Sequence, residues 1–232
     1  MIALRHRIAL RRRITGDDSG LGMVELLVAM LLSGIVLALV ASMFLNVARA
    51  TGQSNLTREA AAVAGNIANQ LSKTVRFAAQ NPVAGTTVLS PAVVEATPVS
   101  LSIISLADAN ASTLAPSRVR FSVSNGQLFE ERLAASNSNG FWVFSGGVPA
   151  MRSLGGTIVP PSSGQAPLFR YRDAAGTELV PGPTGLTAAQ RERVAAVSIT
   201  LRVRSSTSAD APLTVIASTV GMPNLGYAGE GS

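Results

Sequence analysis

The hydrophobic pattern of the chain starts with one uninterrupted apolar run. Residues Leu26 to Ala48 include no charged side chain. As a helix, these roughly 23 residues would rise about 35 Å, which exceeds the ~30 Å hydrocarbon core of a bilayer. The run therefore predicts a membrane-spanning helix.

Past Arg49 the pattern becomes amphipathic. Apolar residues recur at steps of three and four up to Pro82, which is typical of a helix with one buried face. They are Leu56, Ala60, Val63, Ile67, Leu71, Val75 and Ala78. We expect the helix to continue to about residue 80.

After Pro82 the composition shifts to Ser, Thr, Val, Pro and Gly, in short alternating runs separated by turn residues. This pattern predicts antiparallel strands. The predicted strands are Val99–Leu106, Arg118–Val123, Gln127–Leu133, Phe141–Ser145, Leu168–Arg172, Val194–Arg204 and Leu213–Val220. Asn125-Gly126 is the strongest hairpin signal, whereas Gly155–Pro167 and Pro181–Gly185 are expected to be surface loops.

The predicted fold class is α+β, with a long N-terminal helix that packs its apolar stripe on an antiparallel β-sheet head. Three segments are expected: a leader at 1–20, a helix at 21–80 that spans the membrane over about 26–48, and a head at 81–232.

Charge predicts the orientation of the chain in the membrane. The formal net charge is +6, and five arginines precede the apolar run. Because positive residues remain on the cytoplasmic side, the leader is expected in the cytoplasm and the head outside it.

Composition restricts the chemistry. The chain has no Cys, and its only His is His6, in the leader. No nucleotide loop, nucleophile elbow or zinc motif occurs, so we expect neither an enzyme nor a cofactor or metal site. An extracytoplasmic hydrolase acting through the carboxylates of Asp173 and Glu178 is a weak alternative.

The junction before the apolar run holds an unusual acid. It reads Ser19-Gly20-Leu21-Gly22-Met23-Val24-Glu25-Leu26. A carboxylate in a membrane-spanning helix costs roughly 2.5–3.5 kcal/mol on insertion scales, so Glu25 indicates a function.

This junction resembles the processing site of the type IV pilin family, in which a Gly precedes Phe-Thr-Leu-Ile-Glu. The resemblance implies that a prepilin peptidase cuts after Gly20 and methylates Leu21. It also implies that Glu25, then the fifth residue, pairs with the N-terminal ammonium of an adjacent subunit.

Later segments resemble PilW-like minor pilins and J-type pseudopilins of type II secretion. They are Gln70–Arg76, Arg118–Arg132, Phe169–Asp173 and Arg193–Leu201. The resemblance implies a minor structural subunit of a pilus or secretion pseudopilus, with the membrane, the prepilin peptidase and other pilins as partners, and a place in a cell-surface filament.

Two simpler interpretations remain open. Ala48-Arg49-Ala50 has the form of a signal-peptidase site, although an apolar run of about 23 residues is long for a signal peptide. A plain single-span anchor leaves Glu25 unexplained.

Three arginine pairs occupy predicted strands at two-residue spacing: Arg118/Arg120, Arg170/Arg172 and Arg202/Arg204. Period two puts each pair on one face, with Val119, Phe121, Tyr171, Leu201 and Val203 on the other. If the three strands were neighbours, their outer face would suit DNA, a surface or an acidic partner; a solvated sheet face is the simpler interpretation.

Overall fold

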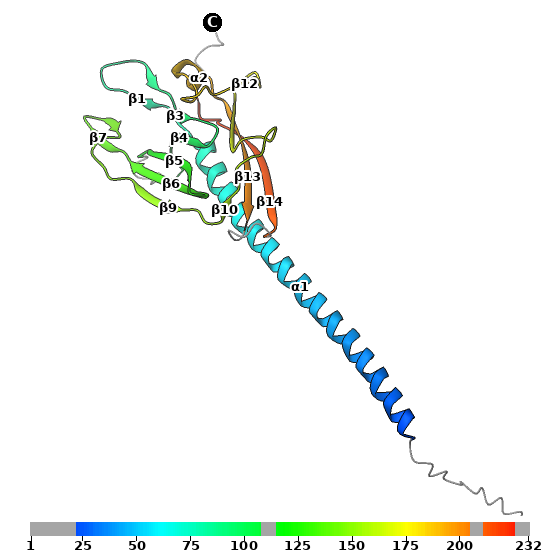
Figure 1. Cartoon of the computed structure of the whole chain (residues 1–232). Helices are drawn as coiled ribbons and strands as arrows, with labels where there is room; N and C mark the ends of the chain where they lie inside the picture. Colours follow the sequence, from blue (N-terminus) through cyan, green and yellow to red (C-terminus); the bar gives the residue numbers. More distant parts are fainter. Residues whose placement is uncertain (1–21, 108–114, 205–210, 226–232) are drawn as a thin grey trace, which may run out of the picture. The chain divides into compact units, whose positions relative to one another are not determined.

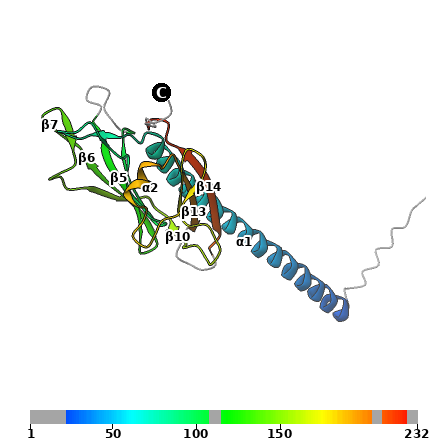
Figure 2. The ribbon, with the colours of Figure 1, turned by 90° about the horizontal axis from the view of Figure 1, so that it is seen from above.

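The computed structural model describes residues 22–107, 115–204 and 211–225 (Figures 1 and 2). It confirms the predicted α+β class, because one long N-terminal helix is followed by antiparallel sheets. The chain forms two compact units, one up to Ala50 and one from Thr51 onward. Helix α1 (Met23–Arg76) supplies residues to both, and each unit is described by itself.

The first unit contains the apolar part of α1. All of its residues from Gly22 to Ala50 are exposed. The run is helical, and it is long and apolar enough to cross a membrane once. Large side chains such as Leu31, Val40 and Phe44 are exposed along it.

In the second unit, α1 buries one face against the sheets. The buried residues fall at the predicted three- and four-residue spacing and are Ala60, Ala64, Ile67, Leu71, Thr74 and Val75. The last turn carries Lys73 and Arg76, whose positive charges oppose the negative end of the helix dipole. The expected helical continuation beyond Arg49 is confirmed.

One five-stranded sheet holds the central part of the chain. Its order is β3 (Val93–Ala96), β4 (Ser100–Ser105), β5 (Ser117–Ser124), β6 (Gln127–Ala134) and β9 (Ala150–Ser153). The predicted hairpin joins β5 to β6, where Asn125 and Gly126 have φ values of 50° and 71°. These positive angles are what a two-residue hairpin turn needs, and Asn and Gly tolerate them.

A second five-stranded sheet holds the C-terminal part. Strand β13 (Ala196–Arg204) is central and pairs with β14 (Leu213–Gly221) along its whole length. On its other side it pairs with β10 (Thr157–Ile158) and with β11 (Phe169–Arg172), which continues to β12 (Glu178–Leu179). Figure 1 shows β13 and β14 side by side near α1.

Smaller elements complete the second unit. Two two-stranded sheets are formed by β1 (Asn81–Pro82) with β2 (Leu89–Ser90) and by β7 (Ser136–Ser138) with β8 (Phe141–Val143). Helix α2 (Ala188–Glu192) starts with a capping box between Thr187 and Gln190.

The predicted single sheet is replaced by separate sheets in the structure. Each predicted strand overlaps an observed one, but alternation along a strand does not reveal its partners. The predicted loop Gly155–Pro167 also contains β10, which is too short to show a period.

Tyr171 joins the two larger sheets inside the core. Its ring lies on β11 with 0% exposure, and its hydroxyl donates to the carbonyl oxygens of Thr97 (2.7 Å) and Ser100 (3.2 Å). Burial, reinforced by the negative charge of Glu95, raises the pKa of the phenol above its ordinary value. The hydroxyl therefore remains a donor across the range in which proteins are handled.

Removing this hydroxyl should destabilise the second unit. A Tyr171→Phe variant keeps the ring but leaves the Thr97 carbonyl without that donor, which should cost about 1–2 kcal/mol in the free energy of unfolding. Denaturant unfolding of the full-length chain in detergent micelles measures the difference. Equal stability of the variant and the wild type would contradict this role.

Candidate functional site

The predicted processing residues Gly20 and Leu21 lie outside the described residues. The structure does describe Glu25, in the first turn of α1, where its backbone N–H donates to the Gly22 carbonyl (2.9 Å). A negative charge in the first turn is favourable to the helix dipole. Within residues 22–107, 115–204 and 211–225, no ion pair involves Glu25.

A groove next to Glu25 is lined by Leu26, Ala29, Met30, Ser33, Gly34 and Leu37. Ala29 and Ser33 follow Glu25 at four-residue steps, and Gly34 lies beside them. Residues four apart occupy one face of a helix, so the two turns that follow the carboxylate on its face carry small side chains. Such a face lets the backbone of another helix approach closely in a membrane.

In the second unit, the three arginine pairs do not form one surface. Strand β5, which carries Arg118 and Arg120, belongs to the first sheet, whereas β11 and β13 are neighbours in the second. The expected parity is confirmed on β5 and β11, where Phe121 and Tyr171 are buried. It is wrong on β13, where Arg202 is buried as well as Leu201 because both faces of this strand are covered. The condition that all three strands are adjacent is not met.

The pair on β5 is engaged locally. Arg120 forms ion pairs with Glu95 (3.2 Å) and Glu131 (3.8 Å), and Arg118 lies 5.9 Å above the ring of Phe144. Carboxylates on β3 and β6 of the same sheet thus offset the positive charge of this face.

The pairs on β11 and β13 are separated along β13. Arg170 lies opposite Ser198 and pairs with Glu178 at 3.9 Å, whereas Arg172 lies opposite Ala196. Arg202 is 8% exposed and donates to the Ala166 carbonyl (2.8 Å). Arg204 lies at the far end of β13, opposite β10. A continuous arginine surface is therefore not present among these six residues.

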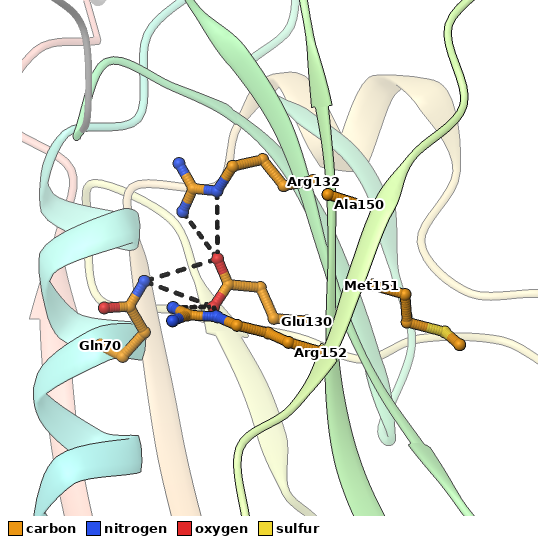
Figure 3. Close-up of a pocket in the computed structure, with 6 residues that line it drawn as sticks. All are labelled: Gln70, Glu130, Arg132, Ala150, Met151 and Arg152. Atoms are coloured by element: carbon orange, nitrogen blue, oxygen red, sulfur yellow. Dashed lines mark hydrogen bonds and ion pairs between the residues drawn. The ribbon is translucent and has the colours of Figure 1, made fainter.

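The structure reveals a charged cluster that the sequence interpretation missed (Figure 3). Glu130 on β6 is 1% exposed, yet it carries a carboxylate. Arg132 donates from Nε (3.2 Å) and Nη2 (2.7 Å) to Oε1, and Arg152 on β9 donates from Nε (3.0 Å) and Nη2 (2.6 Å) to Oε2. Gln70 on α1 adds longer contacts of 3.4 and 3.5 Å.

These two-point contacts orient both guanidinium groups around a buried acid. An unpaired carboxylate at this depth would be strongly destabilising, and the two arginines offset that cost. Because Gln70 comes from α1, the cluster also connects the helix to the edge of the first sheet. One signal was available in the sequence: Glu130 shares its strand face with Leu128, an apolar core residue.

A cleft of about 460 Å³ opens at this cluster. Its lining comes from α1, β6 and β9 and consists of Gln70, Glu130, Arg132, Ala150, Met151 and Arg152. In Figure 3 the arginine and glutamine side chains converge on Glu130, and Met151 points away from them. Within the described residues, Glu130 is the only acid that lines the cleft.

The carboxylates of the hydrolase alternative have other partners. Asp173 pairs with Arg193 at 2.6 Å and accepts from the backbone N–H groups of Ala175 and Thr177. Burial alone would raise the pKa of Asp173, but the hydrogen bonds and the charge of Arg193 lower it below its ordinary value. Among the described residues, no group of acids could hold a metal ion.

Comparisons with known proteins assign no family. No family model matches the sequence, and a search of the curated proteins finds no match.

The lowered pKa of Asp173 predicts a pH-dependent contribution to stability. Because the pKa of Asp173 is lower in the folded chain than its ordinary value of 3.8, the ionised carboxylate stabilises the fold at pH values above 3.8. This stabilisation is lost as the pH falls through the pKa of the folded chain. Thermal unfolding at pH 7, 5 and 3 should show Asp173→Asn less stable than wild type at pH 7, with the gap closing toward pH 3.

The matched control is Glu178→Gln, which removes an exposed acid whose ion pair is long. It should change stability little at each pH. A gap between Asp173→Asn and the wild type that stays constant from pH 7 to pH 3 would refute the assignment.

Proposed function

We propose that the protein is a minor structural subunit of a type IV pilus or a related secretion filament, with a pilin-like fold. A prepilin peptidase would remove residues 1–20, cutting between Gly20 and Leu21, and would methylate Leu21. The mature chain would be held in the membrane by α1 until assembly. Its second unit would stand outside the cytoplasm, and its place would be at the start or tip of the filament.

One observation carries this proposal. Glu25 is the only charged residue from Gly22 to Ala48, and it lies in the first turn of a helix whose apolar surface is fully exposed. A lone helix of this kind has an unpaired acid in lipid, which is costly. A neighbouring subunit that brings a positive charge would remove the cost, and the low dielectric would strengthen that pair.

The small residues below Glu25 support the same interpretation. Ala29, Ser33 and Gly34 give the helix face a low profile, so an adjacent helix can lie close to it. In the proposed filament, the N-terminal ammonium of one mature subunit would then be within reach of Glu25 of the next. The exposed apolar surface would be covered first by lipid and later by neighbouring helices.

The charged side chains of the second unit favour a structural subunit over a polyanion-binding one. Arg120 and Arg170 have carboxylate partners in their own sheets, and Arg202 is buried against a backbone carbonyl. Non-specific DNA binding depends on arginines and lysines that reach phosphates together. The described residues offer no such set among the three arginine pairs.

The processing step predicts the native N-terminus. Intact-mass and peptide mass spectrometry of the protein from its own cells should show a chain that starts at methylated Leu21. A start at Met1 would leave only a membrane-tethered β-domain, and a start at Thr51 would indicate a cleaved signal peptide. Either of these two results would overturn the proposal.

The charge-pairing step predicts the effect of a single substitution. Glu25→Ala should insert into the membrane normally, because it makes the span more apolar, but it should enter filaments at least about tenfold less often, since the intersubunit pair is lost. Immunoblots of sheared filament and membrane fractions measure both quantities.

Met23→Ala, two residues earlier on α1, is the matched control and should assemble normally. Normal incorporation of Glu25→Ala would exclude the pairing mechanism.

A further inference from the structure

Strand β14 forms an open edge of the second sheet. It pairs with β13 along its whole length (Figure 1), and within the described residues no other strand pairs with it. A strand at the edge of a sheet presents a row of unpaired backbone N–H and C=O groups, which can pair with another chain. This row is long, because β14 has 9 residues.

Hydrogen bonds on the other side of β13 show which of its residues face β14. The Thr200 N–H donates to the Leu168 carbonyl (2.9 Å), and the Arg202 carbonyl accepts from the Val159 N–H (2.8 Å). The even-numbered residues of β13 therefore direct their backbone groups away from β14. Because backbone groups alternate in direction along a strand, the odd-numbered residues direct theirs toward it.

The same alternation identifies the outward groups of β14. Ile199 of β13 lies opposite Ser218, and Leu201 lies opposite Ile216, so the even-numbered residues of β14 share hydrogen bonds with β13. The odd-numbered residues of β14 direct their N–H and C=O groups outward. They are Leu213, Val215, Ala217, Thr219 and Gly221.

This edge lacks the features that protect edge strands from association. Natural edges are interrupted by charged side chains, prolines or bulges. β14 contains neither a charged residue nor a proline, and its register with β13 is continuous. Leu213 and Val215 are 44% and 53% exposed, so apolar side chains accompany the unpaired backbone groups. The edge therefore favours the addition of another strand.

A second copy of β14 fits this edge, because the outward residues are symmetric about Ala217. In an antiparallel pair centred there, Ala217 lies opposite Ala217 of the second copy. Val215 then lies opposite Thr219 of the second copy, and Leu213 lies opposite its Gly221. Two large side chains are not placed opposite each other on this face, and an uncharged strand has no like-charge repulsion with its own copy.

The symmetric register also uses the edge most completely. Each outward residue of one copy meets an outward residue of the other. A shift of two residues keeps the direction of the backbone groups, but it leaves either Leu213 or Gly221 without a partner inside the strand. The register centred on Ala217 is therefore the expected one.

We propose that two copies of this chain associate through β14, antiparallel and with the two-fold axis at Ala217, so that their second sheets become continuous. This contact does not rest on the proposed filament. Subunits of a helical filament are related head to tail, whereas this contact is two-fold. In the proposed life of the subunit, it would belong to the chain held in the membrane before assembly, where it would cover the open edge.

The first test uses single cysteines in the full-length chain, in the membranes of the cells that make it. The chain has no Cys, so an introduced thiol is its only one. In a hydrogen-bonded antiparallel pair the two Cα atoms lie about 5.5 Å apart, a distance that a disulfide spans. Under mild oxidation, Ala217→Cys should form a disulfide-linked dimer, measured by non-reducing gel electrophoresis.

Val215→Cys and Thr219→Cys are the matched controls on the same face of β14. Each lies roughly 14 Å from its own counterpart in the proposed register, so each alone should give at least about fivefold less dimer than Ala217→Cys. Co-expression of the two variants should give a mixed dimer, because these positions are opposite each other.

These yields can overturn the proposal. Equal dimer formation by the three single variants would indicate random collision and would exclude the two-fold contact. A strand from a different protein on this edge would leave Ala217→Cys without a disulfide-linked dimer above the controls, which would exclude a second copy as the occupant.

A second test removes one outward hydrogen-bond donor. The Val215 N–H points away from β13, so Val215→Pro removes no bond within the sheet, and edge strands tolerate proline at such positions. Added to Ala217→Cys, it should lower the dimer yield at least about fivefold, whereas Val215→Thr, which keeps the N–H, should retain the yield.

Thermal unfolding of the purified variants shows whether Val215→Pro remains folded. An unchanged dimer yield in folded Val215→Pro would contradict strand pairing. If this variant does not fold, the comparison of the three cysteine variants still decides.

Discussion

The cost of placing a carboxylate in an apolar environment is the constraint on which the rest depends. The chain does this twice, with Glu25 on the apolar part of α1 and with the buried Glu130 on β6 of the first sheet. The cost of burying the Glu130 carboxylate is offset within the chain, by two arginines and a glutamine. Glu25 has no ion pair among the described residues, and the proposed filament would supply one from a neighbouring subunit.

This contrast explains why the two acids suit different tasks. An internal network such as that of Glu130 is complete in a single chain, and it fixes α1 against the sheet at Gln70. In the proposed filament, an acid without an internal partner would make the isolated chain less favourable than the assembled one. The small side chains of Ala29 and Ser33 on the same face would allow the close approach of a neighbouring helix.

Sequence reasoning predicted the elements better than their arrangement. The uncharged apolar run located the first part of α1, and the three- and four-residue period located the second. Alternation together with Asn125-Gly126 located the β5–β6 hairpin. Strand partners are long-range choices that leave no local pattern, so the division into two larger sheets was not predicted. The separation of β5 from β11 and β13 follows from that division.

The Glu130 cluster was missed for a related reason. Its members lie at positions 70, 130, 132 and 152, and only the fold brings them together. The core-facing position of Glu130 on its strand indicated such a cluster, because a charged residue that faces the core needs a partner. Neither the partner nor the cleft could be identified until β9 had been placed beside β6.

The distribution of arginines also bears on what the second unit can recognise. A polyanion is held by many cations acting together over a broad surface, and affinity falls steeply when they are few or already paired. Here Arg120 and Arg170 have acidic neighbours, and the pairs on β11 and β13 lie apart along β13. The three arginine pairs among the described residues therefore do not form a surface of that kind.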